Sequence, residues 1–229
     1  MRRPSFAFAA ALAVAALSLT ATQAEGRQDV ATVAVMDFNA FMMGEGGASV
    51  NLGKAISSML VTEFSGREGM RIVERRQLMD LIQEQDLSLS GRVDDNVAIE
   101  VGKMLGVQYV LLGQAMSIVD NLRIDIRAVD VETSEVIAVM KKTDATIQLL
   151  NVVVELADEF SEALSLTPPS SRPEVEEVPV AATIALSRAL TYEDDGQIEQ
   201  AIEQYEAVLA IHPTHRDAQR ALERLRGAT

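Results

Sequence analysis

The chain has 229 residues, no cysteine, and 34 acidic against 20 basic residues, which gives a formal net charge of −14. The absence of cysteine excludes disulfide bonds and thiolate metal sites. The acidic balance argues against nucleic acid and anionic lipid headgroups as partners, because both bind to basic patches. A charge of this size mainly favours solubility and does not identify a partner.

The first 24 residues are typical of a secretory signal peptide. Arg2 and Arg3 precede a largely apolar run over residues 6–19, and residues 22–24 end on the small residue Ala24, as a cleavage site does. A retained membrane anchor would need about 20 apolar residues, which is longer than this run. We therefore expect cleavage after Ala24, which removes two arginines and brings the net charge to −16.

After the leader, the pattern runs strand, helix, strand. Residues 32–38 and 72–73 are short apolar runs, and residues 52–64 carry apolar side chains on one side at helical spacing. This order is typical of an α/β unit in which a helix covers a sheet. The glycine-rich loop at residues 44–47 is placed like a phosphate-binding loop. Ala48 and Ala55 stand where the Walker pattern needs glycine and a hydroxyl residue, so we expect no nucleotide site.

Two helices and a strand follow between residues 74 and 113. Asp94 and Asp95 begin the second helix, Gly106 is placed for a left-handed C-terminal cap, and residues 107–112 form a buried strand. The side chains expected to face the core recur at helical spacing: Leu78, Leu81, Ile82 and Gln85 in the first helix, and Ala98, Val101 and Leu105 in the second.

Three strands then form a meander, at residues 108–119, 122–131 and 136–143, with polar turn residues between them. Apolar and charged residues alternate in the middle strand, which predicts one buried and one solvated face. Residues 147–164 form a closing helix. The predicted fold class is α/β (α+β), a mixed sheet with a C-terminal antiparallel meander covered by helices, plus a small all-α module.

Several short motifs occur in order along this half of the chain. They are ERxxL from Glu74, the EQ and SG pairs between Glu84 and Gly91, and GK-LG-YVLLG from Gly102 to Gly113. Over residues 33–142 the chain resembles the CsgG family, the curli secretion channel and its soluble periplasmic relatives. The resemblance implies a periplasmic location. Channel subunits of this family carry an acylated cysteine at the mature N-terminus, and Glu25 stands there in this chain, so we expect no covalent lipid anchor.

The C-terminal part has a different composition. Four of the six prolines lie between Thr167 and Pro179, which predicts a semi-extended linker. The tail matches the spacing of one tetratricopeptide repeat followed by a capping helix, at Gly196, Ala201, Tyr205, Val208 and Pro213. One repeat is too short to be stable alone, so it should pack on itself, on the main domain or on another copy. The predicted boundaries are 1–24 (signal peptide), 25–165 (α/β domain), 166–180 (linker) and 181–229 (helical module).

We find no set of residues that predicts catalysis, a cofactor or a metal. The two histidines, His212 and His215, are expected to be solvated turn residues, and a Ser-His-Asp arrangement is nearly excluded by their number. The pair Asp194 and Asp195, like the other carboxylate pairs, is expected at a helix N-terminus or in solvent. Arg75 and its neighbour Arg76 are expected to form salt links within a helix start.

The sequence therefore predicts a non-catalytic periplasmic envelope protein that acts as an accessory or scaffold in the assembly or secretion of surface structures. It would be outer-membrane-associated and would bind protein partners, with a homo-oligomer as one possibility. Two alternatives stay open: an oligomeric outer-membrane secretion channel subunit, or a regulator of a cell-wall synthesis enzyme. The candidate protein-binding residues are Tyr192, Ile198, Gln204 and Tyr205, on the concave face of the helical repeat.

Overall fold

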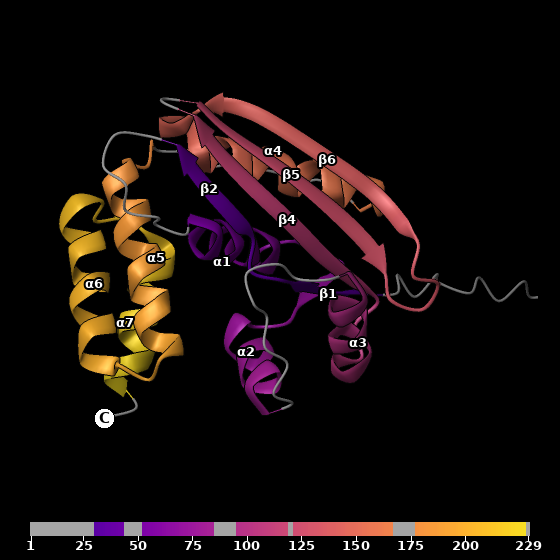
Figure 1. The fold of residues 1–229 in the computed structure, drawn as a ribbon, viewed down its shortest axis with the longest axis horizontal. Coiled ribbons are helices and arrows are strands. Elements are labelled where there is room, and N and C mark those ends of the chain that lie inside the picture. The colour runs from indigo at the N-terminus through magenta and orange to yellow at the C-terminus, as the bar shows by residue number, and fades with distance from the viewer. Residues whose placement is uncertain (1–29, 44–51, 85–94, 119–120, 167–176, 228–229) are drawn as a thin grey trace, which may run out of the picture.

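The computed structural model forms an open mixed sheet of six strands with helices on both faces (Figure 1). It describes residues 30–43, 52–84, 95–118, 121–166 and 177–227. The signal peptide, the glycine-rich loop and most of the predicted linker lie outside the described residues. In chain order, the elements are β1 (Ala31–Val35), β2 (Asn39–Met43), α1 (Leu52–Ser65), β3 (Met70–Ile72), α2 (Arg75–Glu84), α3 (Asp95–Leu105), β4 (Tyr109–Ile118), β5 (Asn121–Asp130), β6 (Val136–Ala145), η1 (Thr146–Gln148), α4 (Leu149–Ala163), α5 (Val180–Asp194), α6 (Ile198–Ile211) and α7 (Arg216–Gly227).

The sheet has the strand order β3-β1-β4-β5-β6. Strand β1 pairs in parallel with both β3 and β4, and β2 runs parallel to the far half of β4. Strands β4, β5 and β6 form an antiparallel meander. The predicted mixed sheet with a C-terminal meander is therefore confirmed.

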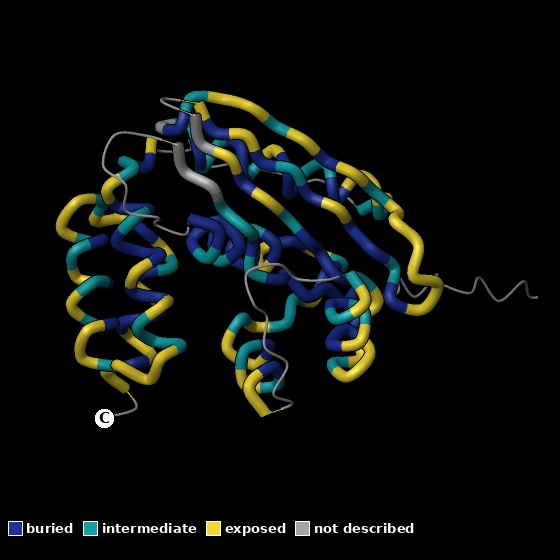
Figure 2. Tube along the Cα trace, viewed as in Figure 1, coloured by how far each residue is buried: buried dark blue, intermediate teal, exposed yellow. Residues whose placement is uncertain are grey.

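Alternating side chains of the central strands divide the core into two layers. Val33 and Val35 of β1 face the layer that contains α1 and α4, while Ala34 of the same strand faces the layer under α2 and α3. This division follows from the period of two along a strand. Both layers are nearly free of solvent, and Figure 2 shows the buried residues gathered between the sheet and its helices.

Helices α5, α6 and α7 pack against the sheet domain and do not form a separate unit. Helix α5 lies beside α1 (Figure 1) and contacts it. The buried side chains of the two helices belong to one continuous core. Among the expected packing partners of the tail, the structure therefore shows the main domain. Val178, at the end of the predicted linker, is only 1% exposed and belongs to the same core.

Most of the other predicted elements agree with the structure to within a few residues. Gly106 has a φ of 65°, which confirms the left-handed cap after α3. Leu78 and Ile82 are buried as expected, whereas Gln85 lies outside the described residues. Strand β2 was not predicted, because the predicted first strand covers residues 32–38 and ends before β2 begins at Asn39. In the structure the chain leaves β1 at Val35 and resumes pairing with β4 only from Asn39.

Candidate functional site: a cleft beside helix α2

A cleft of about 780 Å³ lies between α2 and the C-terminal helices. Helix α1 contributes to its floor, α2 forms one wall, and α5, α6 and α7 form the other (Figure 1). Apolar side chains of the lining are Val61, Met79, Leu186, Leu190, Ile198, Ala221 and Leu225. Charged side chains of the lining are Glu74, Arg75, Arg76, Asp80, Glu193, Asp194, Asp217, Arg220 and Arg224.

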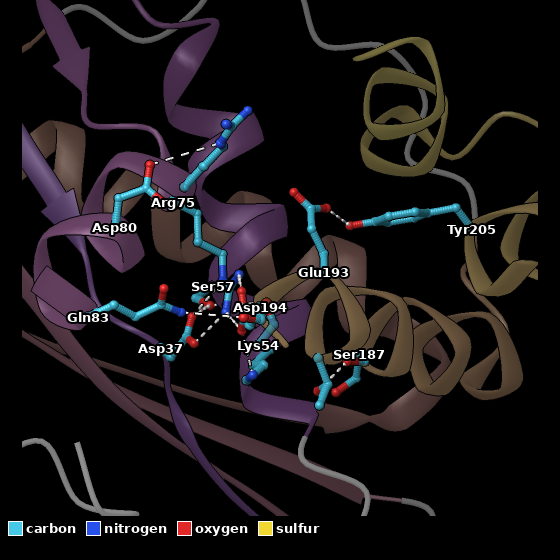
Figure 3. Close-up of polar contacts among 12 residues, drawn as sticks. Asp37, Lys54, Ser57, Arg75, Asp80, Gln83, Ser187, Glu193, Asp194 and Tyr205 are labelled. Atoms are coloured by element: carbon cyan, nitrogen blue, oxygen red, sulfur yellow. Dashed lines mark hydrogen bonds and ion pairs between the residues drawn. The ribbon is translucent and has the colours of Figure 1, made fainter. Parts of the chain in front are cut away.

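Arg75 joins the two walls of the cleft through four hydrogen bonds. Its Nε and Nη2 atoms donate to the two carboxylate oxygens of Asp37 at 2.8 and 2.6 Å. Its Nη1 and Nη2 atoms donate to the two carboxylate oxygens of Asp194, both at 2.7 Å. Bidentate pairs of this kind fix geometry as well as charge. Arg75 therefore ties the start of α2 to the segment after β1 and to the last residue of α5 (Figure 3).

Two neighbours complete this cluster. Lys54 of α1 donates to Asp194 at 2.6 Å, and Ser57 of the same helix donates to Asp37 at 3.2 Å. The side chain of Arg75 is 11% exposed, and those of Asp37 and Asp194 are 17% and 15% exposed. Two cations and two carboxylates thus balance one another where solvent access is low, which offsets part of the cost of taking each charge out of water.

Arg75 and Asp194 each shift the pKa of the other so that both charged forms are favoured. Burial opposes the ionised form of Asp194, but hydrogen bonds and charge from Arg75 and Lys54 outweigh burial and hold the pKa of Asp194 below its usual range. Burial likewise acts to lower the pKa of Arg75, and the two carboxylates outweigh it and raise that pKa. Arg75 and Asp194 therefore stabilise each other in their charged forms, and their hydrogen bonds hold α2 against the end of α5.

The C-terminal wall carries a second polar group of residues. The hydroxyl of Tyr205 donates to Glu193 Oε2 at 2.9 Å, as Figure 3 shows, and Arg224 Nη1 approaches Glu193 Oε1 at 2.7 Å. Tyr205 is 1% exposed, and burial together with the charge of Glu193 raises its pKa. These contacts join α5, α6 and α7, so the wall is a fixed surface.

A small cavity of about 40 Å³ lies near the other end of α7, lined by both histidines. His215 is only 5% exposed, so the prediction of a solvated turn residue is wrong for it. Burial lowers the pKa of His215 to about 4, and neither ring nitrogen has a hydrogen-bond partner among the described residues. His212 is half-buried. The imidazole rings of His212 and His215 pack edge to face, with their centroids 5.7 Å apart. The turn packs inward because α7 folds back against α1.

Asp217, in the first turn of α7, faces α1. It accepts a hydrogen bond from the Thr62 hydroxyl, and its side chain is 11% exposed. Burial raises its pKa to about 6. Asp217 also lines the large cleft, so an ionisable group with a raised pKa stands at the junction of the two cavities.

The structure separates the four candidate binding residues into two pairs. Ile198 and Tyr205 line the cleft, although Tyr205 is almost wholly buried and offers the cleft little surface. Tyr192 and Gln204 are half-buried and do not line it. Tyr192 packs against the core instead.

Sequence reasoning missed the cluster that holds the cleft. Asp194 was expected at a helix N-terminus or in solvent, but it ends α5 and pairs with Arg75 and Lys54. Arg75 was expected to form salt links within its own helix start, but its partners lie 38 and 119 residues away. Of the two arginines, Arg76 is the one that pairs within its own helix, as predicted. Its Nε lies 3.9 Å from Oδ2 of Asp80, one turn further along α2. The one feature of the sequence that singled out Arg75 was the ERxxL motif, of which Arg75 is the second residue.

The described residues contain no group of three or more His, Cys, Asp or Glu side chains placed to hold a metal ion. Within the same part of the chain, no helix is long and apolar enough to cross a membrane. The lining of the cleft mixes apolar and charged side chains, and four of the charged ones are bound within the walls, Arg75 to Asp194 and Arg224 to Glu193.

Comparison with known proteins gives one family match. Residues 14–119 match the model of the curli production assembly/transport component CsgG. This match supports the resemblance that the motifs predicted. It ends before β5, so β5, β6 and all the helices that follow lie outside it, and the tetratricopeptide assignment stays a prediction. No curated protein matches the chain.

Solved structures give partial likenesses. The LpoB C-terminal domain from Salmonella enterica is 22% identical with a TM-score of 0.43, covering 54% of this chain and 89% of that one. Lipoprotein GNA1162 from Neisseria meningitidis is 15% identical with a TM-score of 0.41, covering 60% and 99%. The PelC dodecamer from Paraburkholderia phytofirmans is 15% identical with a TM-score of 0.36, covering 62% and 91%.

Proposed function

We propose that this chain is a non-catalytic accessory protein of the cell envelope, located in the periplasm, which holds a segment of a partner protein in the cleft beside α2. The observation that carries the proposal is the construction of the cleft. Helix α2 and the C-terminal helices form its two walls, and the Arg75 cluster locks one wall to the other. A site built in this way has a fixed shape before a partner arrives, which reduces the cost of binding.

Two further findings support the envelope assignment. The match to the CsgG model connects the first half of the chain with a family of transport and assembly components. The leader pattern of residues 1–24 predicts export. Participation in assembly or secretion of surface structures is part of the same proposal.

The chemistry of the cleft supports a binding role over a catalytic one. A catalytic base or nucleophile must be able to act on a substrate. Here the carboxylate of Glu193 is bound by Tyr205 and Arg224, and that of Asp194 by Arg75 and Lys54. Both carboxylates therefore already bind groups of the protein itself, and their role is to join the helices that form the walls.

The proposal is tested in the native host by location and phenotype together. Osmotic release should place the tagged chain in the periplasmic fraction, and deletion of its gene should raise sensitivity to detergents that act on the envelope. The charge-reversed double variant Arg76→Glu/Arg220→Glu should fail to restore resistance, because both exposed side chains line the cleft. The matched control Lys103→Glu, on the exposed face of α3, should restore it. Cytoplasmic retention, or full function of the double variant, would contradict the proposal.

A further inference from the structure

Two carboxylates that line the cleft have no cation of their own. Three of the five carboxylates in the lining pair with arginines of the lining: Glu193 with Arg224, Asp194 with Arg75, and Asp80 with Arg76. The other two, Glu74 and Asp217, form no ion pair with a described lysine or arginine. Glu74 is exposed, whereas the side chain of Asp217 is only 11% exposed. The cleft therefore holds a carboxylate that is largely removed from water and has no counter-charge in contact.

The surroundings of Asp217 do not fully stabilise its ionised form. Burial raises its pKa, and the charge of Glu74 across the cleft raises it further. The hydroxyl of Thr62 on α1 donates a hydrogen bond to it, and the charges of Arg216 and Arg220 on its own helix also act against burial. Burial outweighs these effects, so that the pKa reaches about 6. A cation in direct contact would offset the cost of keeping this carboxylate out of water.

His215 is a second polar group beside Asp217 that lacks a partner. Its side chain is 4% exposed, and neither ring nitrogen has a hydrogen-bond partner among the described residues. Its Nδ1 lies 3.9 Å from Oδ2 of Asp217, which is too far for a direct hydrogen bond. Burial favours the neutral ring, and with its proton on Nε2 this ring offers Nδ1 as an acceptor. A donor about 2.8 Å from both atoms would fit between them. The small cavity of about 40 Å³, which both residues line, has room for it.

We propose that the partner segment in the cleft carries a lysine whose ammonium group binds between Asp217 and His215. The inference rests on the proposed function and names the side chain that the cleft selects. An ammonium group combines three hydrogen-bond donors with a compact positive charge, so it can bond to both acceptor atoms and neutralise the carboxylate. Ala221 and Leu225, one and two turns further along α7, line the cleft and give the four-carbon stem of the lysine an apolar surface.

Lysine fits this site better than arginine or a neutral group does. The guanidinium of arginine is a wide, planar fork that suits two oxygens of one carboxylate, whereas the acceptors here belong to two residues and border a small cavity. A hydroxyl group or a water molecule could bridge the same two atoms, but it would leave the charge of Asp217 without a counter-charge. Arg76 and Arg220 are exposed in the lining of the cleft, so the same segment should present acidic residues to them.

The purified mature chain from Glu25 gives a test that needs no partner. n-Butylammonium has the four carbons and the ammonium group of a lysine side chain, and carbon-13 NMR of the Asp217 carboxyl follows its ionisation. With about 100 mM n-butylammonium chloride, the titration midpoint should lie about half a pH unit below that in the same concentration of sodium chloride, as a Kd of about 50 mM for the ionised form requires. The same concentration of n-butanol should leave the midpoint unchanged. Equal midpoints in the two salts overturn the inference.

In the native host, photo-crosslinking from position 79 in the cleft tests the contact with the partner itself. Asp217→Asn should reduce the adduct about tenfold, because the lysine loses its charged acceptor. Asp195→Asn removes an exposed carboxylate outside the lining and should leave the adduct unchanged. Replacing the lysine of the crosslinked segment with methionine should reduce the adduct by the same factor, and both changes together should reduce it no further.

Urea unfolding of Asp217→Asn at pH 7.5 serves as the folding control, and a loss of adduct without a loss of stability assigns the effect to binding. An adduct that survives Asp217→Asn, or a crosslinked segment without lysine, overturns the inference and leaves the proposed function standing. The absence of any adduct from the unsubstituted cleft contradicts the proposed function instead, and the n-butylammonium titration still decides whether Asp217 binds an alkylammonium group.

Discussion

Arg75 is the residue on which the geometry of the cleft depends. Replacing it with alanine would leave Asp37 and Asp194 facing each other with reduced solvent access and without their shared cation. Breaking a buried ion pair costs about 3–5 kcal/mol, and partial exposure lowers this to about 2–3 kcal/mol here. Urea unfolding of Arg75→Ala should show that loss.

The matched variant Arg75→Lys keeps the charge but cannot bond both carboxylates in bidentate fashion. It should therefore lose less stability than the alanine variant. A loss below about 0.5 kcal/mol for Arg75→Ala, the level of an ordinary surface change, would show that the cluster does not hold the walls.

Gly113 of β4 has a steric role that differs from the conformational role of Gly106. A Cβ on Gly113 would lie 2.4 Å from the ring of Phe38, which is 1% exposed. Overpacking of this kind costs about 1–3 kcal/mol. Gly113→Ala should lower the midpoint of thermal unfolding accordingly.

At Gly106 a Cβ would meet nothing within 4 Å, so Gly106→Ala should cost only the strain of a positive φ, about 1 kcal/mol. Equal stability of Gly113→Ala and the wild type would show that Phe38 can move aside at no cost. The two glycines thus separate a packing requirement from a backbone requirement.

At the scale of single residues, the sequence predicted roles better for apolar side chains than for charged ones. Leu78 and Ile82 follow from periodicity because their neighbours on the same helix define the buried face. The partners of Arg75 come from two other elements, and no local pattern specifies which carboxylate a given arginine meets. His215 was misjudged for the same reason, since residues of α1, which lies far away in the sequence, line the same small cavity.

Helix α7 makes its contact with α1 sensitive to pH through Asp217. Its folded pKa of about 6 lies above the ordinary value of 3.8, so the folded state binds this proton more tightly. The group therefore adds stability as pH falls from about 6 towards 4, and its ionisation costs stability above pH 6. Asp217→Asn should be more stable than the wild type by about 3 kcal/mol at pH 7.5.

That gain should shrink towards zero near pH 4, where the aspartate is protonated in the folded state. Urea unfolding at both pH values measures it. Asp80→Asn, on an exposed side chain of α2, is the control and should change little at either pH. An asparagine variant that is less stable at pH 7.5 than the wild type would contradict the assignment.

His215, at the turn before α7, should act in the opposite direction. Its folded pKa of about 4 lies below 6.5, so its contribution to stability is complete above pH 6.5 and is lost as pH falls towards 4. His215→Leu should remove this acid-dependent loss while keeping a similar volume in the cavity. If the variant and the wild type lose stability in parallel between pH 6.5 and 4, the histidine is not buried in its neutral form.

At the scale of elements, local patterns predicted the helices and the meander, and they failed where pairing is non-local. Strand β1 ends at Val35, and β2 begins at Asn39 further along β4. The predicted first strand runs on through the break to residue 38, and no strand is predicted over residues 39–43. Register against a distant strand decides where pairing stops, and the local sequence contains no signal for it.

At the scale of the whole molecule, the C-terminal helices share the core of the sheet domain. Asp194 of α5 bonds to Lys54 of α1, and Asp217 of α7 bonds to Thr62. We therefore expect one cooperative thermal transition for the mature chain, with equal calorimetric and van't Hoff enthalpies. A chain that ends at Leu166 should lose that cooperativity, since α1 would expose its apolar contact with α5. Two separate transitions in the mature chain would instead support independent units joined by the predicted linker.

The match to the CsgG model ends before the structure does, and the cleft requires both the matched part and the part beyond it. Helix α2 lies inside the matched segment, whereas α5, α6 and α7 lie outside it. A function assigned to the cleft therefore belongs to the combination of the two parts, and it should be absent from either part alone.

The most direct test of the proposed function is photo-crosslinking in the native host from two methionine positions. Met79 lines the cleft, and Met104 on α3 is 46% exposed away from it. A photoreactive residue at position 79 should yield one discrete adduct with an envelope protein, and Arg76→Glu/Arg220→Glu should abolish that adduct. The same residue at position 104 should yield none. Equal adducts from both positions, or none from position 79 in cells where the chain is functional, would contradict the account.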